Sequence, residues 1–219
     1  MEQYFEILEK CPLFKGVQRD DISGILKCLE VKIKEYRKGE TVFLQGDAVC
    51  FFGVVLEGSI QIIRNDYYGN RSIVTTAMPS QLFAETFAFA KASAVPLSAW
   101  AYGDSTVMFI NPEKIIGQCS KVCDFHSRII SNLIKVMASK NLEINKKLEI
   151  VSKRTTRDKL MTYLFLTSQE LGTKSFTVPF NRQELADYLE VDRSGLSAEI
   201  GKLKKEGKLL CRRSEFTVL

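Results

Sequence analysis

The sequence predicts an α+β protein built from three parts. These are an N-terminal jelly-roll or double-stranded β-helix sensor over residues 1–120, a long dimerisation helix over 121–150 and a C-terminal winged helix-turn-helix over 151–219. Glycine-centred turns recur at short intervals in the first half, a helical period runs without proline through the middle, and two capped helical segments lie close together near the end. A length of 219 residues with 45% apolar residues allows about two globular domains.

The first half is expected to begin with helices and continue with short strands. The first thirty residues have helical spacing, with core residues expected at Leu8, Ile22, Ile25, Leu26 and Leu29. From about residue 30 to about 110, glycine turns separate β-rich runs with no helical period between them. These runs are Thr41–Leu44, Phe51–Leu56, Ile60–Arg64 and Arg71–Thr76. Regular short strands of this kind predict a sandwich or jelly-roll.

From about Asn111 the apolar residues recur with a helical spacing. Asn111-Pro112 marks the start of a helix, because proline fits the first turn of a helix. No further proline occurs before Pro179. A helix of about thirty residues is too long to be buried by one small sandwich, so a second copy of itself is its simplest partner. A long helix lying on its own domain is the alternative. The expected dimer interface consists of apolar positions at spacings of three and four: Val122, Phe125, Ile129, Leu133, Val136 and Ile144.

Residues 181–207 predict a helix-turn-helix, preceded by a hinge near Ser152 and a helix over Thr156–Leu171. Asn181 is a good N-cap, and Glu184 lies where its carboxylate can reach back to the Asn181 backbone. Asp192 is expected to cap a second helix, and Gly207 to end it in a left-handed conformation. The apolar face of that second helix consists of Leu196, Ile200 and Leu203.

The opposite face of the second helix carries small residues and lysines. Small side chains let a helix enter the major groove, and lysines reach phosphates. A C-terminal hairpin with strands at Leu209–Cys211 and Phe216–Leu219 would form a wing. Residues 152–219 also hold 13 Lys and Arg against 9 Asp and Glu, which is +4 of the chain's net +5. The expected DNA-binding residues are Arg182, Arg193, Ser194, Ser197, Ala198, Lys202, Lys205, Arg212 and Arg213. Two ordinary amphipathic helices are the alternative.

The whole chain resembles the CRP/FNR family of bacterial transcription regulators. The motifs that carry the resemblance are Cys11-Pro12-Leu13-Phe14-Lys15-Gly16, Lys38-Gly39-Glu40, Gln45-Gly46-Asp47, Leu56-Glu57-Gly58 and Asn181-Arg182-Gln183-Glu184-Leu185-Ala186. The resemblance implies a cyclic-nucleotide-binding-like β-roll effector domain over 1–120. It also implies a homodimer, a near-palindromic double-stranded DNA operator and RNA polymerase as partners, with a small-molecule effector that changes how the two reading helices are presented.

The sequence departs from the family where cyclic nucleotides bind. Members that bind them carry a Gly-Glu pair and, further on, an Arg that neutralises the cyclic phosphate. Here Glu85 is kept, but Leu97 occupies the position of that Arg. A buried phosphate without a cation loses its strongest contact, so we expect no cofactor and an effector other than cAMP. The expected effector pocket is formed by Phe83, Glu85, Thr86, Leu97, Ser98 and Trp100.

A second departure lies in the reading helix. Arg193 matches a family arginine and can donate to O6 and N7 of a guanine. The second polar position of the family falls at Ala198, whose methyl group can meet a thymine methyl. Glu190 stands at a turn position where glycine is frequent, which predicts a strained backbone there.

The cysteines and the single histidine, His126, leave other readings open. Without a secretion signal we expect a cytoplasmic protein with reduced thiols and no membrane segment. Cys119 and Cys123 could begin a metal or redox site, but no further ligand pair accompanies them, so no metal is expected. Cys11, Cys28 and Cys50 are too widely spaced for the family's iron–sulfur pattern, and haem bound through His126 remains an alternative. A thiol-redox regulator and a cyclic-nucleotide-binding module remain alternatives. A jelly-roll enzyme is disfavoured because it would need clustered metal ligands.

Overall fold

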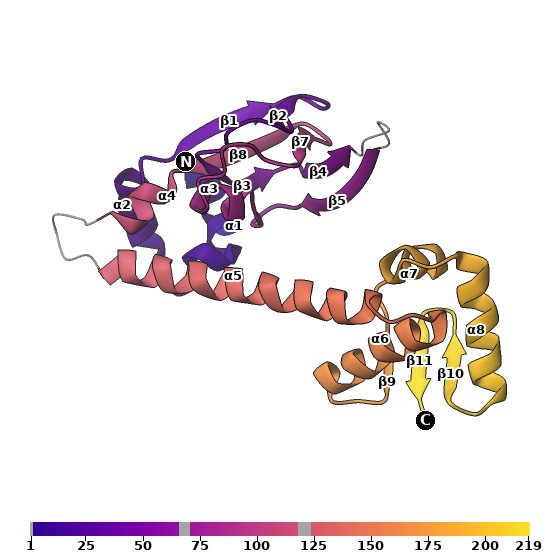
Figure 1. Ribbon diagram of the computed structural model, residues 1–219. Coiled ribbons are helices and arrows are strands. Elements are labelled where there is room, and N and C mark those ends of the chain that lie inside the picture. The colour runs from indigo at the N-terminus through magenta and orange to yellow at the C-terminus, as the bar shows by residue number, and fades with distance from the viewer. Residues whose placement is uncertain (1, 66–70, 118–123) are drawn as a thin grey trace. The chain divides into compact units, whose positions relative to one another are not determined.

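The computed structural model describes residues 2–65, 71–117 and 124–219 (Figure 1). The chain divides into two compact units, Met1–Ala138 and Ser139–Leu219, and the division falls inside one long helix. No helix of the described segments combines the length and apolar character that crossing a membrane requires.

Short helices begin the N-terminal unit. They are the 3-10 helices Glu2–Tyr4 and Pro12–Phe14 and the α-helices α1 (Phe5–Lys10) and α2 (Arg19–Cys28). Their apolar faces meet in one core, where Leu8 and Ile22 are fully buried. Ile25, Leu26 and Leu29 join the same core, which confirms the helical reading of the first thirty residues.

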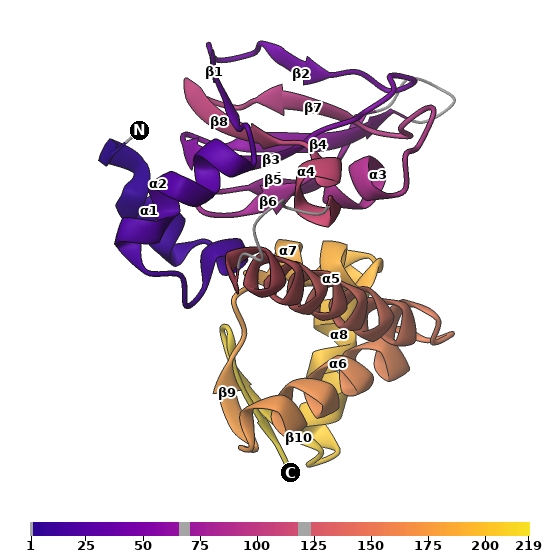
Figure 2. The same ribbon diagram turned by 90° about the vertical axis from the view of Figure 1, so that its left-hand side faces the viewer.

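Two four-stranded antiparallel sheets follow, and Figure 2 shows them as two layers. One has the order β1-β8-β3-β6, with strands Lys32–Tyr36, Ser105–Ile110, Phe52–Glu57 and Leu82–Phe83. The other has the order β2-β7-β4-β5, with strands Thr41–Phe43, Ser98–Ala101, Ile60–Asn65 and Arg71–Ala77. Val55 and Val107 of the first sheet share a core with Ile60 and Ala99 of the second. The expected jelly-roll is confirmed.

Three helices complete this part of the chain: α3 (Glu85–Phe89), α4 (Pro112–Ile116) and the long helix α5 (Asp124–Val151). The first half of α5 lies against the N-terminal helices. Asn132 donates from Nδ2 to the carbonyl oxygens of Leu13 at 3.0 Å and Lys15 at 2.8 Å, and Arg128 donates to the carbonyl of Gly16. These bonds fix which face of α5 points into its own unit.

Two positions of the expected dimer interface belong to that inward face. Ile129 is 1% exposed and Leu133 is 5% exposed, and both join the core of α1 and α2. The prediction that they form the dimer seam is wrong, because spacings of three and four look alike whether a face packs on its own domain or on a partner. Val136 is half-buried and Ile144 is 65% exposed. Val122 and the side chain of Phe125 lie outside what the structure describes.

The C-terminal unit contains the end of α5, then α6 (Thr156–Leu171), α7 (Arg182–Leu189) and α8 (Arg193–Lys205). A three-stranded antiparallel sheet has the order β10-β11-β9, with strands Leu209–Arg212, Glu215–Val218 and Ser175–Thr177. Helices and sheet share one core that includes Leu160, Leu185, Leu196 and Phe216. This arrangement confirms the expected winged helix-turn-helix.

Candidate DNA interface and effector segment

The capping box of α7 forms as its sequence predicts. Asn181 Oδ1 accepts the N–H groups of Gln183 at 2.9 Å and Glu184 at 3.0 Å. Glu184 Oε2 in return accepts the N–H of Asn181 at 2.7 Å. Since each contact satisfies a donor that the first turn leaves open, the start of α7 is held at a defined residue.

Replacing Asn181 with alanine should therefore lower the free energy of unfolding by about 1 kcal/mol, because two backbone N–H groups lose their acceptor. Asn181→Ser is the matched control, since its hydroxyl can accept the same bonds. Urea titrations of both variants measure the difference. Equal midpoints for Asn181→Ala and the parent protein would show that the cap contributes nothing.

The turn between α7 and α8 is strained and braced. Glu190 has φ 52° and ψ 55°, a left-handed conformation unusual for glutamate. Lys159 Nζ lies 3.2 Å from the Glu190 carbonyl, and Lys147 of α5 donates to the Tyr188 carbonyl with its ammonium 4.2 Å from the Tyr188 ring centre. Two lysines thus hold the carbonyl end of α7, where the helix dipole favours cations. Burial lowers the pKa of Lys147.

Helix α8 starts at the expected cap. Asp192 Oδ2 accepts the N–H of Gly195 at 2.8 Å, and the Ser194 hydroxyl donates to the same carboxylate oxygen. These bonds hold the pKa of Asp192 below its usual value, and the bond from the Ser194 hydroxyl has the largest effect. Leu196, Ile200 and Leu203 are buried, so the predicted inward face is confirmed.

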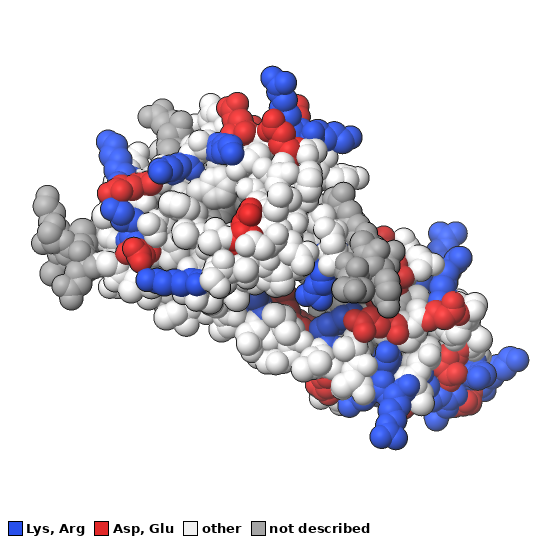
Figure 3. All heavy atoms as spheres, turned by 45° about the horizontal axis from the view of Figure 1, so that its top comes forward, with Lys and Arg blue, Asp and Glu red and all other residues white. Residues whose placement is uncertain are grey.

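The outward face of α8 is open to solvent. The exposed residues on it are Arg193, Ser194, Ser197, Ala198, Lys202 and Lys205. Lys202 Nζ lies 3.4 Å from Glu199 Oε2, so this lysine is partly engaged within the helix. Figure 3 shows lysine and arginine side chains projecting from the C-terminal unit, with acidic side chains between them. Contact with DNA remains a prediction for all six residues.

The wing turns where the sequence predicts, at Arg213 and Ser214 between β10 and β11. Arg212 and Arg213 are exposed there. Arg182 is half-buried instead, with Nη2 3.1 Å from the Arg213 carbonyl and its guanidinium 5.7 Å from the centre of the Phe216 ring. Arg182 therefore braces the wing turn, a role that its place in the sequence did not indicate.

A second brace joins α6 to the reading helix. Arg157 Nε lies 2.5 Å from Glu199 Oε1, and its two terminal nitrogens lie 2.9 Å and 2.6 Å from the carboxylate oxygens of Glu206. Hydrogen bonds from Arg157 hold the pKa values of Glu199 and Glu206 below their usual range. Sequence analysis missed this network because its partners are about forty residues apart, beyond any helical spacing.

The expected effector residues come together inside and beside the β-roll. Leu97 is 8% exposed and lies in one apolar cluster with Phe83 and Phe87. The Phe83 ring approaches Gly53 so closely that a Cβ there would lie 2.3 Å from it. Leu97 is therefore packed among apolar side chains.

The polar members of this segment differ in exposure. Glu85, the first residue of α3, is 3% exposed, and Ser98 is equally buried. Ser98 Oγ accepts the N–H of Gln45 at 2.8 Å. Thr86 is exposed and Trp100 is half-buried. The structure thus places Glu85, Leu97 and Ser98 in the interior, and a ligand role for any of them stays a prediction.

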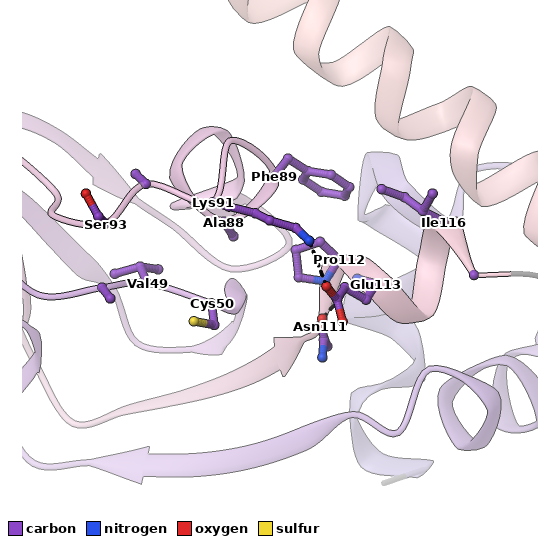
Figure 4. Close-up of a pocket in the computed structure, with 13 residues that line it drawn as sticks. Val49, Cys50, Ala88, Phe89, Lys91, Ser93, Asn111, Pro112, Glu113 and Ile116 are labelled. Atoms are coloured by element: carbon purple, nitrogen blue, oxygen red, sulfur yellow. Dashed lines mark hydrogen bonds and ion pairs between the residues drawn. The ribbon is translucent and has the colours of Figure 1, made fainter.

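A separate cavity lies between α3, α4 and the loop before β3, and no motif in the sequence indicated it. Its volume is about 570 Å³. Figure 4 shows Lys91 reaching across it to Glu113, with Nζ 2.9 Å from Oε1. This bond raises the pKa of Lys91 and lowers that of Glu113. Cys50 contributes a free, exposed thiol to the lining.

The described cysteines have different surroundings. Burial raises the pKa of the Cys11 thiol to about 12, which makes it a poor nucleophile at neutral pH. The exposed Cys28 has its Sγ 3.9 Å from His126 Nε2, which in turn lies 3.1 Å from the Lys114 carbonyl. Cys119 and Cys123 lie outside the described residues. Within the described ranges no three His, Cys, Asp or Glu side chains are grouped to hold a metal ion.

Comparison with known proteins agrees with this architecture. Residues 33–121 match the cyclic nucleotide-binding domain. The transcriptional activator protein FnrA of Stutzerimonas stutzeri is 21% identical over 84% of this chain and 75% of its own length. A CRP-like cAMP-activated global transcriptional regulator of Mycobacterium tuberculosis is 29% identical, over 38% of this chain and only 37% of that relative.

The fold has a solved counterpart over nearly its whole length. The catabolite activator protein of Thermus thermophilus superposes with a TM-score of 0.58 at 21% identity, covering 95% of this chain and 93% of that one. The relatives are transcription regulators rather than enzymes. The chain is therefore similar to regulators of the CRP/FNR type, with a match to the cyclic nucleotide-binding domain in its N-terminal unit and the fold of the Thermus thermophilus catabolite activator protein.

Proposed function

We propose that this chain is a homodimeric, sequence-specific DNA-binding transcription regulator whose effector is not cAMP. Its remaining partners in this proposal are a near-palindromic operator and RNA polymerase. The observation that carries the proposal is the presentation of α8. Its apolar face is buried and its small and basic face is exposed. Asp192 caps it, Arg157 of α6 pairs with its acidic side chains, and Lys147 and Lys159 bond carbonyls at the preceding turn.

The dimer is supported by a heptad stripe along α5. Positions spaced three and four apart run through Ile130, Ile134, Met137, Asn141, Ile144 and Leu148. Ile130 and Met137 are half-buried against the core of the N-terminal unit, and the other four are exposed. Ile134, Ile144 and Leu148 are 61%, 65% and 60% exposed, which is unusual for apolar residues at regular intervals on one helix. A second copy of α5 would cover them as a coiled coil, with Asn141 at a core position where a polar residue specifies register.

Sedimentation of the purified protein tests assembly directly. The proposal predicts two chains per particle in solution and two chains on each bound DNA duplex. A monomer that binds duplex one to one would contradict the dimer while leaving the helix-turn-helix reading intact.

The choice of effector is supported by the apolar packing of Leu97. A cyclic phosphate needs a cation, and Leu97 occupies that position beside the buried Ser98 and an apolar cluster. Calorimetry with cAMP or cGMP should show no saturable binding at micromolar ligand. Tight cAMP binding by the unmodified protein would overturn this part of the proposal. The protein would then resemble the mycobacterial relative, which is named as cAMP-activated.

Leu97→Arg tests whether restoring a cation at this position creates affinity for cyclic nucleotides. The new guanidinium would stand beside Ser98 and could create weak cyclic-nucleotide affinity if Phe83 and Phe87 yield space. No binding by either the parent or Leu97→Arg would favour a pocket closed by side chains. Circular dichroism is the necessary companion measurement, because an arginine placed into this cluster also costs stability.

Thiol oxidation remains the second candidate for control, favoured by the approach of Cys28 to His126. An imidazole near a thiol can stabilise its thiolate, which is the reactive form. Operator affinity measured under reducing and oxidising conditions separates control by thiol oxidation from control by a small-molecule effector. Cys28→Ser should remove any redox dependence if this pair is responsible.

A further inference from the structure

The cavity beside α3 and α4 has the size and lining of a small-molecule site. Its volume of about 570 Å³ falls among ligand cavities, which span roughly 300–1,000 Å³ and are mainly apolar with few polar groups. Val49, Phe89, Pro112 and Ile116 are among its apolar lining residues. All lining residues belong to the N-terminal unit, and the effector residues Glu85 and Leu97 are not among them.

The polar part of the lining is concentrated around one ion pair. Among the described residues that line the cavity, Lys91 is the one cation, and it forms an ion pair with the carboxylate of Glu113. Asn111 accepts the N–H of Glu113 through Oδ1 at 2.9 Å, and Figure 4 shows its amide nitrogen pointing away from Lys91. The Lys91 and Glu113 side chains are 77% and 66% exposed, so either can exchange its partner for water at little cost.

We propose that this cavity binds a small monocarboxylate with an apolar body. The ligand carboxylate replaces that of Glu113 on Lys91, while its apolar body covers Phe89 and Ile116. A carboxylate fits because the contact it would make is the one that Glu113 makes now. A cationic ligand would instead meet Lys91, and a fully apolar one would leave the polar edge unused.

Ligand binding at the Lys91–Glu113 ion pair would change how α3 and α4 are connected. Lys91 lies two residues after the end of α3 (Glu85–Phe89), and Glu113 belongs to α4, the last described element before α5. A ligand that takes Lys91 away from Glu113 removes a tie between these two elements. The regulatory meaning of that release rests on the proposed function, whereas ligand binding itself does not depend on it.

Alkylation of Cys50 provides a direct measure of occupancy in the full-length protein. We expect 3-phenylpropanoate to slow the reaction of Cys50 with iodoacetamide in a saturable manner, read by peptide mass spectrometry. The exposed Cys28, which does not line the cavity, is the internal control and should react at an unchanged rate. The neutral analogue 3-phenylpropan-1-ol should protect Cys50 at least about tenfold less well, because it lacks the charge-assisted contact.

Two variants should move the affinity in opposite directions. Lys91→Met should weaken 3-phenylpropanoate binding at least about tenfold, because the cation is lost. Glu113→Gln should strengthen it, because the competing carboxylate is removed. Lys27→Met, an exposed lysine on α2, is the matched control and should bind like the parent protein.

Several results would overturn the proposal. They are absence of saturable protection at millimolar ligand, equal protection by the alcohol, and binding that is unaffected by Lys91→Met or weakened by Glu113→Gln. The substituted side chains, those of Lys27, Lys91 and Glu113, are exposed, so circular dichroism should show parent-like folding. DNA binding is not part of the readout, so these outcomes stay distinct from a failure of the proposed regulator function.

Discussion

Ile144→Asp is expected to separate the dimer and abolish high-affinity operator binding. In the proposed seam this position is covered by the partner helix, where a carboxylate would be desolvated without a counter-charge. We expect the dimer to weaken at least about 100-fold, equivalent to about 2.7 kcal/mol. Because Ile144 is 65% exposed in the single chain, the variant should keep its fold. Sedimentation velocity and circular dichroism measure the two properties separately.

Two other substitutions on α5 serve as controls. Leu142 is 69% exposed on the same helix but lies off the heptad stripe, so Leu142→Asp should leave the dimer intact. Leu133 is 5% exposed in the core of its own unit, so Leu133→Asp should destabilise that unit by about 3–5 kcal/mol. An Ile144→Asp protein that remains dimeric would exclude the heptad stripe of α5 as the main interface.

Arg193→Ala is expected to relax the sequence preference of DNA binding. Arg193 is exposed at the first position of α8, where a guanidinium can donate two bonds to one guanine. Its loss should cost about 1–3 kcal/mol per half-site and remove discrimination at one base pair. Competition binding against operators that differ at single positions measures both effects.

Lys205→Ala is the matched comparison on the same helix. A phosphate contact carries no sequence information, so this variant should weaken all duplexes alike and reduce the salt dependence of binding. If Arg193→Ala lost affinity uniformly, as expected for Lys205→Ala, α8 would not read bases through Arg193.

Local signals allowed much of the fold to be predicted. Helix α6 has the bounds Thr156–Leu171 that the sequence indicated, because both of its ends are set by neighbours in the chain. Thr155 Oγ1 accepts the N–H of Asp158 at 3.1 Å, and Gly172 ends the helix in a left-handed conformation with φ 64°. The capping box at Asn181 and the wing turn at Arg213 were predictable for the same reason.

Features that depend on distant partners were not predictable. The periodicity of α5 shows apolar positions on the helix but not which of them face its own unit, so Ile129 and Leu133 were misassigned. The bonds from Arg157 to Glu199 and Glu206 and the wing contact of Arg182 have no local pattern. The cavity at Lys91 and Glu113 likewise arises only when α3, α4 and the loop at Cys50 are brought together.

Selection of bound sequences from random double-stranded DNA tests the central claim most directly. A twofold pair of α8 helices predicts enrichment of an inverted repeat whose half-sites are centred about one helical turn apart, roughly 34 Å. Arg193→Ala should lose one base-pair preference in each half-site of that repeat. Enrichment of no sequence, or of a single unrepeated site, would contradict the account of this chain as a dimeric sequence-specific regulator.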